Sequence, residues 1–292
     1  MIWIRRLKNI TDVAVGSEAY RDMKTRIIAA VALLPLLLLI VLAAPKIFTA
    51  ILFGLMAAVA AFELLKGTGL VKNTRLTVYS MAMALYVCIW CGLKLGYAWL
   101  LLGVLLFWVA LFAEMMLSDM KLRFEKLAAC FVAGLLLPIL LGALVRIHSG
   151  EHGRAFIFVP FIFAFLSDTG AYFAGYFFGK HKLAPVISPK KTVEGVVGGV
   201  VGAILGMVIY CLVLQFAFDY DVNYLYAVIY GAVGSAGAVF GDLCFSVIKR
   251  QTGIKDYGNL IPGHGGILDR FDSMMVVGPL AEVLLLLLPV AV

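Results

Sequence analysis

Long apolar runs that recur along the whole chain are the feature that most constrains its fold. Each run is close to the roughly 20 residues that an α-helix needs to cross the hydrocarbon of a bilayer. Of the 292 residues 63% are hydrophobic and only 14% are charged, and the mean hydropathy is +1.04, far from soluble domains. We therefore predict an all-α polytopic integral membrane protein with about nine transmembrane helices, at about 27–45, 47–65, 76–93, 95–117, 127–145, 155–179, 193–218, 223–248 and 273–292.

The apolar runs leave little sequence for a separate soluble domain. We expect residues 23–292 to form a single transmembrane domain and residues 1–22 to be an extension ahead of it. Trp3, Leu7 and Ile10 fall at helical spacing opposite basic residues, which suits a helix on the membrane surface. A disordered extension is the alternative. The first span is longer than a signal peptide, and a small-residue cleavage site does not follow it.

Positive charge predicts the orientation. In the nine-span arrangement, twenty of the 24 Lys and Arg residues fall on one side, together with the N-terminus. The other four are Lys46, Lys94, Arg146 and Arg154. Since cytoplasmic loops of membrane proteins are rich in Lys and Arg, we place the N-terminus in the cytoplasm. The net charge of +7 then reflects topology and attraction to anionic lipid, and we expect no nucleic-acid partner.

One connection between spans carries an unusual density of charge and glycine. It is part of the stretch Ser246–Asp272, which lies on the predicted cytoplasmic side. Lys and Arg bind phosphate, carboxylates bind the hard cations that accompany phosphate, and glycine lets the backbone approach a ligand. We therefore predict an active site at the membrane surface, with candidate residues Lys249, Arg250, Lys255, Asp256, His264, Gly265, Gly266, Asp269, Arg270 and Asp272.

Polar residues near the cytoplasmic ends of other spans should converge on this stretch. A carboxylate within a span is costly unless it is paired or functional. Asp242, Ser246 and Lys249 are spaced by four and three and would share one helix face. Asp269 and Asp272 would share a face at the start of the last span. The remaining candidates are Asp168 in the sixth span and Ser188, Lys190 and Lys191, in the block Ser188–Gly195 that we expect to open the seventh span.

Several other residues have ordinary explanations. Glu63 and Glu114 lie at span ends, where a carboxylate is common, and mid-span Glu282 is expected to pair with a neighbouring helix. His264 is equally well explained as a hydrogen-bonding loop residue or as a ligand. Small residues at short spacing favour close helix packing, which accounts for Gly198, Gly202 and Gly206 and for the cysteines Cys88 and Cys91.

The pattern from Ser246 to Asp272 resembles the signature of the phosphatidate cytidylyltransferase (CDP-diacylglycerol synthase) family. It reads Ser-x2-Lys-Arg-x4-Lys-Asp-x-Gly-x2-Ile-Pro-Gly-His-Gly-Gly-Ile-x-Asp-Arg-Phe-Asp. Three further blocks are similar: Ser167–Tyr172, Ser188–Gly195 and Gly241–Leu243. The resemblance covers about residues 160–272. Val193 departs from the aromatic residue that the family often has, which concerns packing or lipid contact, and the extension 1–22 is outside the pattern.

The resemblance implies transfer of a cytidylyl group from CTP to phosphatidic acid, giving CDP-diacylglycerol and pyrophosphate. It implies Mg²⁺ and allows a second monovalent or divalent cation, and it implies a homodimer in a bacterial inner membrane with the site facing the cytoplasm. Asp242 and Asp269 would be the metal ligands, with Asp168 and Asp272 as second candidates. Substrate phosphates would be held by Lys249, Arg250, Lys255 and Arg270, with Lys190 and Lys191 on the triphosphate or the lipid headgroup, and with Ser188, Ser246, His264, Gly265 and Gly266 nearby.

Two alternatives stay open at this stage. A related enzyme, such as a CDP-archaeol synthase or a polyprenol kinase, would use the same nucleotide chemistry on another lipid. A transporter would also place ionisable residues in spans, but at the bilayer midplane and between inverted repeats. The charges here gather at the cytoplasmic interface, and the apolar segments show no inverted repeat.

Overall fold

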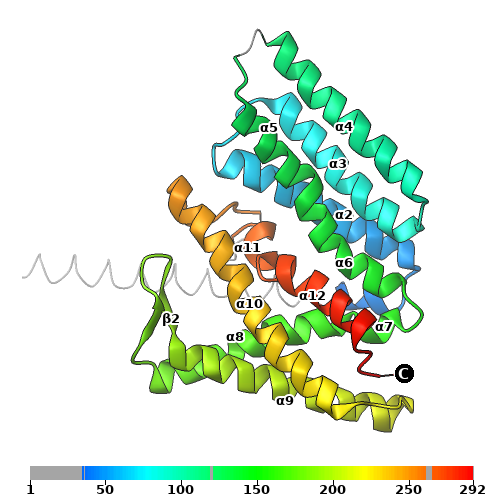
Figure 1. The fold of residues 1–292 in the computed structure, drawn as a ribbon, viewed down its shortest axis with the longest axis vertical. Helices are drawn as coiled ribbons and strands as arrows, with labels where there is room; N and C mark the ends of the chain where they lie inside the picture. The colour runs from blue at the N-terminus through cyan, green and yellow to red at the C-terminus, as the bar shows by residue number, and fades with distance from the viewer. Residues whose placement is uncertain (1–34, 36, 119–120, 261–264, 292) are drawn as a thin grey trace, which may run out of the picture.

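A computed structural model describes residues 35, 37–118, 121–260 and 265–291. The extension 1–22, about half of the first expected span (residues 27–34 and 36) and His264 lie outside these residues, so their predictions are not tested. The described chain is helical except for one small hairpin (Figure 1). Its elements are α2 (Lys46–Phe62), η1 (Glu63–Gly67), α3 (Thr74–Leu93), α4 (Tyr97–Leu117), α5 (Phe124–Phe131), η2 (Val132–Leu136), α6 (Leu137–Ser149), α7 (Gly153–Phe156), α8 (Phe158–Phe178), β1 (Lys182–Ala184), β2 (Ser188–Thr192), α9 (Val193–Phe218), α10 (Tyr224–Thr252), α11 (Ile267–Phe271) and α12 (Met274–Leu287).

Seven helical segments are long and apolar enough to cross a membrane: Lys46–Gly67, Thr74–Leu93, Tyr97–Leu117, Phe124–Ser149, Gly153–Phe178, Val193–Phe218 and Tyr224–Thr252. Each coincides with one of the nine expected spans, which confirms the class of polytopic helical membrane protein. The count of nine is not confirmed. The last expected span contains α12, which has only 14 residues with Pro279 inside it. The short helix α11 precedes it, so the chain turns where one continuous helix was expected.

The hairpin β1–β2 was not predicted. Its strands are antiparallel, with Lys182 opposite Thr192 and Ala184 opposite Ser188. We expected the block Ser188–Gly195 to open the span at 193–218, and α9 has these bounds, with Thr192 capping it by accepting the amide of Gly195 at 3.1 Å. The part of the block before Val193 is a strand, in line with Pro189, because a proline disfavours the helical conformation for the residue before it.

Close packing of α8 on α9 explains the glycine series of the seventh span. A Cβ added to Gly198 would lie 2.2 Å from the Cβ of Ala174, and one added to Gly202 would lie 2.7 Å from the carbonyl oxygen of Leu166. Such contacts are shorter than any side chain allows, so glycine is required for these helices to touch. The prediction that these glycines permit helix packing is confirmed within the chain. In Figure 1, α8 and α9 run side by side, and α10 and α12 pack above them.

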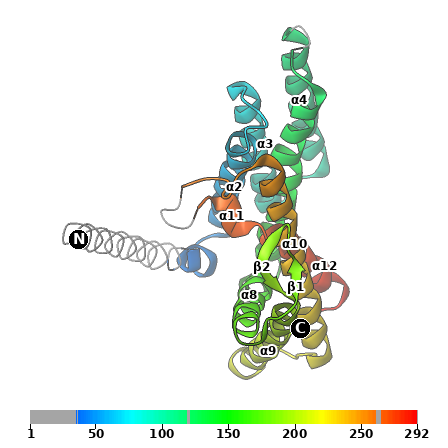
Figure 2. The same ribbon diagram turned by 90° about the vertical axis from the view of Figure 1, so that its left-hand side faces the viewer.

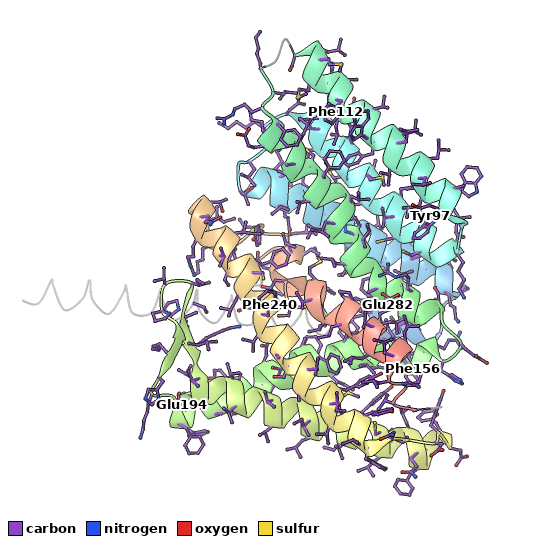
Figure 3. The ribbon with its side chains drawn as sticks, in the orientation of Figure 1. Tyr97, Phe112, Phe156, Glu194, Phe240 and Glu282 are labelled. Carbon is purple, nitrogen blue, oxygen red and sulfur yellow. The ribbon has the colours of Figure 1, made fainter. Side chains whose placement is uncertain are left out.

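A second group of helices, α2, α3 and α6, packs beside the α8–α12 group. An ion pair joins the two: Arg146 on α6 donates from Nε and Nη2 to the two carboxylate oxygens of Glu282 on α12, both at 2.7 Å. Figure 3 shows Glu282 on the part of α12 that lies beside α6. Glu282 therefore pairs with a neighbouring helix, as predicted. Cys88 and Cys91 are buried free thiols on α3, in line with their predicted packing role.

The connections between helices gather at two ends of the molecule. At one end, the Lys46 ammonium donates to the carbonyl oxygen of Gly150 at 2.7 Å, and Val222 forms a β-bridge with Ala291. At the other end lie the hairpin, the end of α10 and helix α11, which face the viewer in Figure 2. This grouping agrees with the alternation of sides in the predicted topology, although it does not say which end is cytoplasmic.

The Arg146–Glu282 pair predicts a large cost for removing one partner. Both side chains are less than one-third exposed (29% and 21%), so Glu282→Ala would leave a cation unpaired among apolar helices. We expect a loss of about 3–5 kcal/mol in the free energy of unfolding, measured by denaturant titration in detergent. The double variant Arg146→Met/Glu282→Leu should lose less than the single variant. Removal of the exposed partner Glu125 from its pair with Arg123 is the matched control and should change little.

Candidate active site

The site is built around one face of α10, at the C-terminal end of that helix. Asp242 and Lys249 line a cavity of about 670 Å³ that we call the main cavity, and Ser246 is buried between them along the helix. Helix α11 completes the wall with Asp269, and Asp272 follows it directly. The spacings that predicted shared helix faces therefore bring these side chains together.

The lining of the main cavity contains both apolar and charged residues. Its apolar residues come from the segment 37–41, from the start of α8 and the residue just before it, and from Phe271 and Met274. Its charged residues are five carboxylates and two cations: Asp168, Asp242, Asp256, Asp269 and Asp272 with Lys249 and Arg270. A molecule that fills this space would therefore have both an apolar part and a charged or polar part.

Asp269 organises the loop between α10 and α11, residues 253–266, which we call the signature loop. Its Oδ2 accepts the amides of Tyr257 at 2.8 Å and Gly266 at 3.0 Å, while its Oδ1 accepts from the Lys249 ammonium at 3.1 Å. The Asp269 side chain is only 2% exposed. These hydrogen bonds offset the cost of burying a charged group. Asp269 therefore joins two points of the signature loop, Tyr257 and Gly266, to Lys249 of α10.

Lys249 connects the carboxylates of the main cavity. Besides its bond to Asp269, its ammonium lies 3.9 Å from Oδ2 of Asp272 and 5.4 Å from the centre of the Tyr257 ring. The tyrosine hydroxyl donates to the carbonyl oxygen of Phe245 at 2.9 Å. Lys249 is thus fixed in place by an ion pair on one side and an aromatic face on the other.

The hairpin brings a second cation to the site. The Lys191 ammonium lies 2.5 Å from Oδ2 of Asp242, which joins β2 to α10. Lys190 and Lys191 also line a second cavity of about 520 Å³, together with Tyr172 and Tyr176 of α8. Asp168 lines both cavities. The two cavities therefore adjoin at Asp168.

Two sets of contacts hold the hairpin in this position. Glu194, where the hairpin joins α9 (Figure 3), accepts the amides of Lys180 and His181 and pairs with the His181 ring at 2.6 Å. At the other end, Nε of Arg250 donates to the carbonyl oxygen of Ile187 at 3.0 Å. Arg250 was predicted to bind phosphate, and this contact gives it a role in fixing the hairpin.

The remaining predicted residues occupy different positions. Arg270 is exposed and lines the main cavity, and Gly265 has a φ of +85° that favours glycine, next to buried Gly266. Two of the predicted substrate-binding residues, Ser188 and Lys255, are described by the structure but line neither cavity. Their predicted contacts with substrate stay predictions, as does that of His264, which lies outside the described residues.

Burial, and after it the negative charge of Asp242, raises the pKa of Asp272 from 3.8 to about 7. The amide of Ser273 and the Lys249 ammonium oppose this shift. Carboxylates that are close together and poorly hydrated resist ionising together. The five carboxylates of the main cavity thus outnumber its two lining cations together with Lys191, which pairs with Asp242.

The carboxylates that line the main cavity suit a hard divalent cation, which prefers carboxylate oxygens as ligands. In the part of the chain that the structure describes, no group of three or more Cys, His, Asp and Glu side chains is already arranged as a metal site. Asp242 and Asp272 fit such a role, because both face the main cavity and the pKa of one responds to the charge of the other. Asp269, the other predicted ligand, already accepts three donors.

One residue of the site was missed. Glu63 seemed an ordinary span-end carboxylate, but it is buried and accepts the amides of Ile267 and Leu268 at 3.0 and 2.8 Å. Its partners are backbone groups, which carry no sequence signal of their own. The Glu63 carboxylate leaves no room for a side chain at Gly258 or Gly266, so these two glycines are the sequence feature that is associated with it.

Comparison with known proteins identifies the family of the chain. The sequence model of the cytidylyltransferase family matches residues 24–288, nearly the whole chain. This chain belongs to the cytidylyltransferase family. The family resemblance that the signature implied is thereby confirmed, and the match begins close to the predicted start of the transmembrane domain.

Similar curated proteins carry a more specific name. Phosphatidate cytidylyltransferases from Staphylococcus epidermidis and Staphylococcus aureus are 38% and 37% identical to this chain over 166 residues. Each match covers 57% of this chain and 62% of the relative, so it spans less than two-thirds of these curated relatives.

The pKa of Asp272 predicts a pH dependence of stability. Because its folded-state pKa, about 7, lies above the ordinary 3.8, the folded protein keeps a proton that the unfolded chain releases. Its stability contribution is therefore full below about pH 4 and is lost as pH rises through 7. We expect Asp272→Asn to remove this loss. The check compares thermal unfolding midpoints of both proteins between pH 5 and 8 in EDTA. Parallel curves would contradict the assignment.

Proposed function

We propose that this chain transfers the cytidylyl group of CTP to phosphatidic acid, giving CDP-diacylglycerol and pyrophosphate. The main cavity is the observation that carries this proposal. The apolar residues of its lining suit acyl chains, and the charged residues suit a phosphate headgroup accompanied by a cation. The name of the staphylococcal relatives supports phosphatidic acid as the lipid.

In this reaction a phosphate oxygen of phosphatidic acid attacks the α-phosphorus of CTP, and pyrophosphate leaves. Such transfers depend on positioning and charge neutralisation more than on covalent help from the protein. Lys249 and Arg270 at the main cavity neutralise and orient the lipid phosphate. Lys190 and Lys191 at the second cavity do the same for the triphosphate. The junction of the two cavities at Asp168 is where the two substrates meet.

Mg²⁺ is part of the proposal. Two polyanionic substrates would not approach five carboxylates unless cations compensated the charge. Asp242 would hold the ion, with Asp272 or Asp168 beside it and Asp269 either as a further ligand or as the residue that fixes the signature loop. Bound there, Mg²⁺ would neutralise the negative charge that develops on the transferring phosphoryl group. A second cation could occupy the same group of carboxylates.

The proposal also places the protein in the cell. We infer nine spans, an N-terminus in the cytoplasm and a site that faces the cytoplasm of a bacterial inner membrane, where CTP is available. The twenty-to-four separation of Lys and Arg supports this orientation. The homodimer that the family resemblance implies stays a prediction, and the glycines of α9 pack against α8 of the same chain.

The direct experiment uses the purified full chain in detergent with Mg²⁺, radiolabelled CTP and phosphatidic acid. The proposal expects lipid-soluble label and release of pyrophosphate. Archaetidic-type ether lipid or a polyprenol replaces phosphatidic acid in parallel reactions. Label on one of those lipids alone would favour the related lipid enzyme, and label on none of them would contradict lipid nucleotidyl transfer.

Asp242→Asn and Asp269→Asn should each lower turnover at least roughly a hundredfold, because charge compensation around the phosphates is worth several kcal/mol. Asp221→Asn is the control, since Asp221 is an exposed residue at the opposite end of the molecule. The measurement is initial rate against Mg²⁺ concentration. If excess Mg²⁺ partly restores Asp242→Asn but not Asp269→Asn, then Asp242 is a ligand and Asp269 fixes the loop. Near-normal rates in Asp242→Asn would contradict the metal assignment.

Orientation has its own test. Asn259 in the signature loop and Asp221 before α10 are both exposed, so a cysteine at either position should react with a thiol reagent. In sealed right-side-out vesicles, a membrane-impermeant reagent should label Asp221→Cys and spare Asn259→Cys until the membrane is permeabilised. The reverse pattern would overturn the proposed orientation.

A further inference from the structure

Glu63 links the first half of the chain to the signature region. It lies at the start of η1, directly after α2, and is only 3% exposed. Its Oε1 accepts the amide of Ile267 at 3.0 Å and its Oε2 accepts the amide of Leu268 at 2.8 Å, across 204 and 205 residues of sequence. These are the first two amides of α11, and the first amides of a helix have no acceptor within it.

The glycines around Glu63 show that its carboxylate determines the local sequence. A Cβ added to Gly266 would lie 2.5 Å from Cδ, Oε1 and Oε2 of Glu63, and one added to Gly258 would lie 2.5 Å from Oε1. Gly266 has φ −86° and ψ 173°, a conformation open to any residue. The conformation of Gly266 therefore does not require glycine, whereas the Glu63 carboxylate does.

Helix α11 depends on such external contacts. It has five residues, and a helix this short does not hold itself together. Helix α11 contains Asp269 and Arg270, and Asp272 follows it directly. The orientation of α11 therefore determines the positions of these three side chains, which line the main cavity. Asp269 fixes the helix from the side of the signature loop, and Glu63 fixes it from the side of α2.

We propose that Glu63 is a positioning residue for the transfer reaction: its carboxylate fixes the start of α11 and thereby places Asp269, Arg270 and Asp272 at the reacting phosphates. The role rests on the proposed function. Glu63 lies outside the described lining of both cavities, so it acts through α11. A displacement of about 1 Å at reacting groups can cost on the order of a hundredfold in rate, which is the scale of effect expected here.

Glu63→Gln is the first test. Glutamine keeps the size of the side chain and one acceptor oxygen, but its amide group presents a donor to a backbone amide. We expect kcat to fall at least roughly tenfold, with KM for CTP changed much less, because the nucleotide is assigned to the second cavity. Glu114→Gln is the matched control: Glu114 also ends a span on this side and accepts from Arg75 at 3.2 Å, and it should keep normal kinetics.

Hydrogen–deuterium exchange tests the same contact without any turnover. Peptides that cover residues 265–271 should exchange faster in Glu63→Gln than in the parent or in Glu114→Gln, while the apparent melting temperature stays similar. Two results would overturn the proposal, provided that the parent is active. One is unchanged exchange in Glu63→Gln, and the other is faster exchange in Glu63→Gln with a kcat equal to that of the parent. A parent protein that labels no lipid at all would instead show that the proposed function is wrong.

A double-mutant cycle separates positioning from a general loss of stability. Gly266→Ala should lower kcat because the new methyl group displaces the Glu63 carboxylate. If both changes act on one contact, Gly266→Ala should cost little more once Glu63 is alanine, since coupled residues are not additive. Fully additive losses would mean that the two residues act independently, against the proposal. Partial recovery of activity in Glu63→Ala/Gly266→Ala relative to Gly266→Ala would support it.

Discussion

A carboxylate that is removed from water beside a bilayer needs a cation or hydrogen-bond donors as partners, and most of the described structure around the site follows from that requirement. The free-energy cost of burying an unpaired ion exceeds that of most other single features in a protein of this size. Four carboxylates meet this requirement in four different ways. Glu282 meets an arginine fork, Asp242 meets a lysine, Asp269 meets a lysine and two amides, and Glu63 meets two amides alone.

These pairings also join segments that are far apart in the sequence. Arg146 and Glu282 connect the two groups of helices, Lys191 and Asp242 connect the hairpin to α10, and Glu63 connects α2 to α11. Apolar packing between helices tolerates small sliding motions because it has no direction. Hydrogen-bonded ion pairs do have direction, so they fix the rotation and depth of each helix. The geometry of the main cavity is set by these few contacts on a framework that packing alone would leave less precise.

The sequence predicted the helices well because apolar length is a direct consequence of bilayer thickness. It also predicted that Asp242, Ser246 and Lys249 share a face, since helical periodicity is fixed by the backbone. It failed at the hairpin, because Ser188–Thr192 carries capping residues that read equally well as the start of a helix. It failed again at Glu63, whose partners are backbone amides more than 200 residues away. Contacts to the backbone leave no complementary side chain to find, so only their steric consequence, Gly258 and Gly266, is visible in the sequence.

The two lysines of the site illustrate how the same charges serve folding and function. Lys191 and Lys249 each pair with a carboxylate, although both were predicted to bind phosphate. These roles are compatible under the proposed function. When an anionic substrate binds together with a cation, the lysine can pair with the substrate phosphate and the carboxylate can pair with the cation. Lysine is suited to such an exchange, since its ammonium is a compact charge on a flexible stem, whereas arginine holds a fixed fork. The chain uses them in that way: the structural pair at Glu282 has an arginine, and the two pairs that face the cavities have lysines.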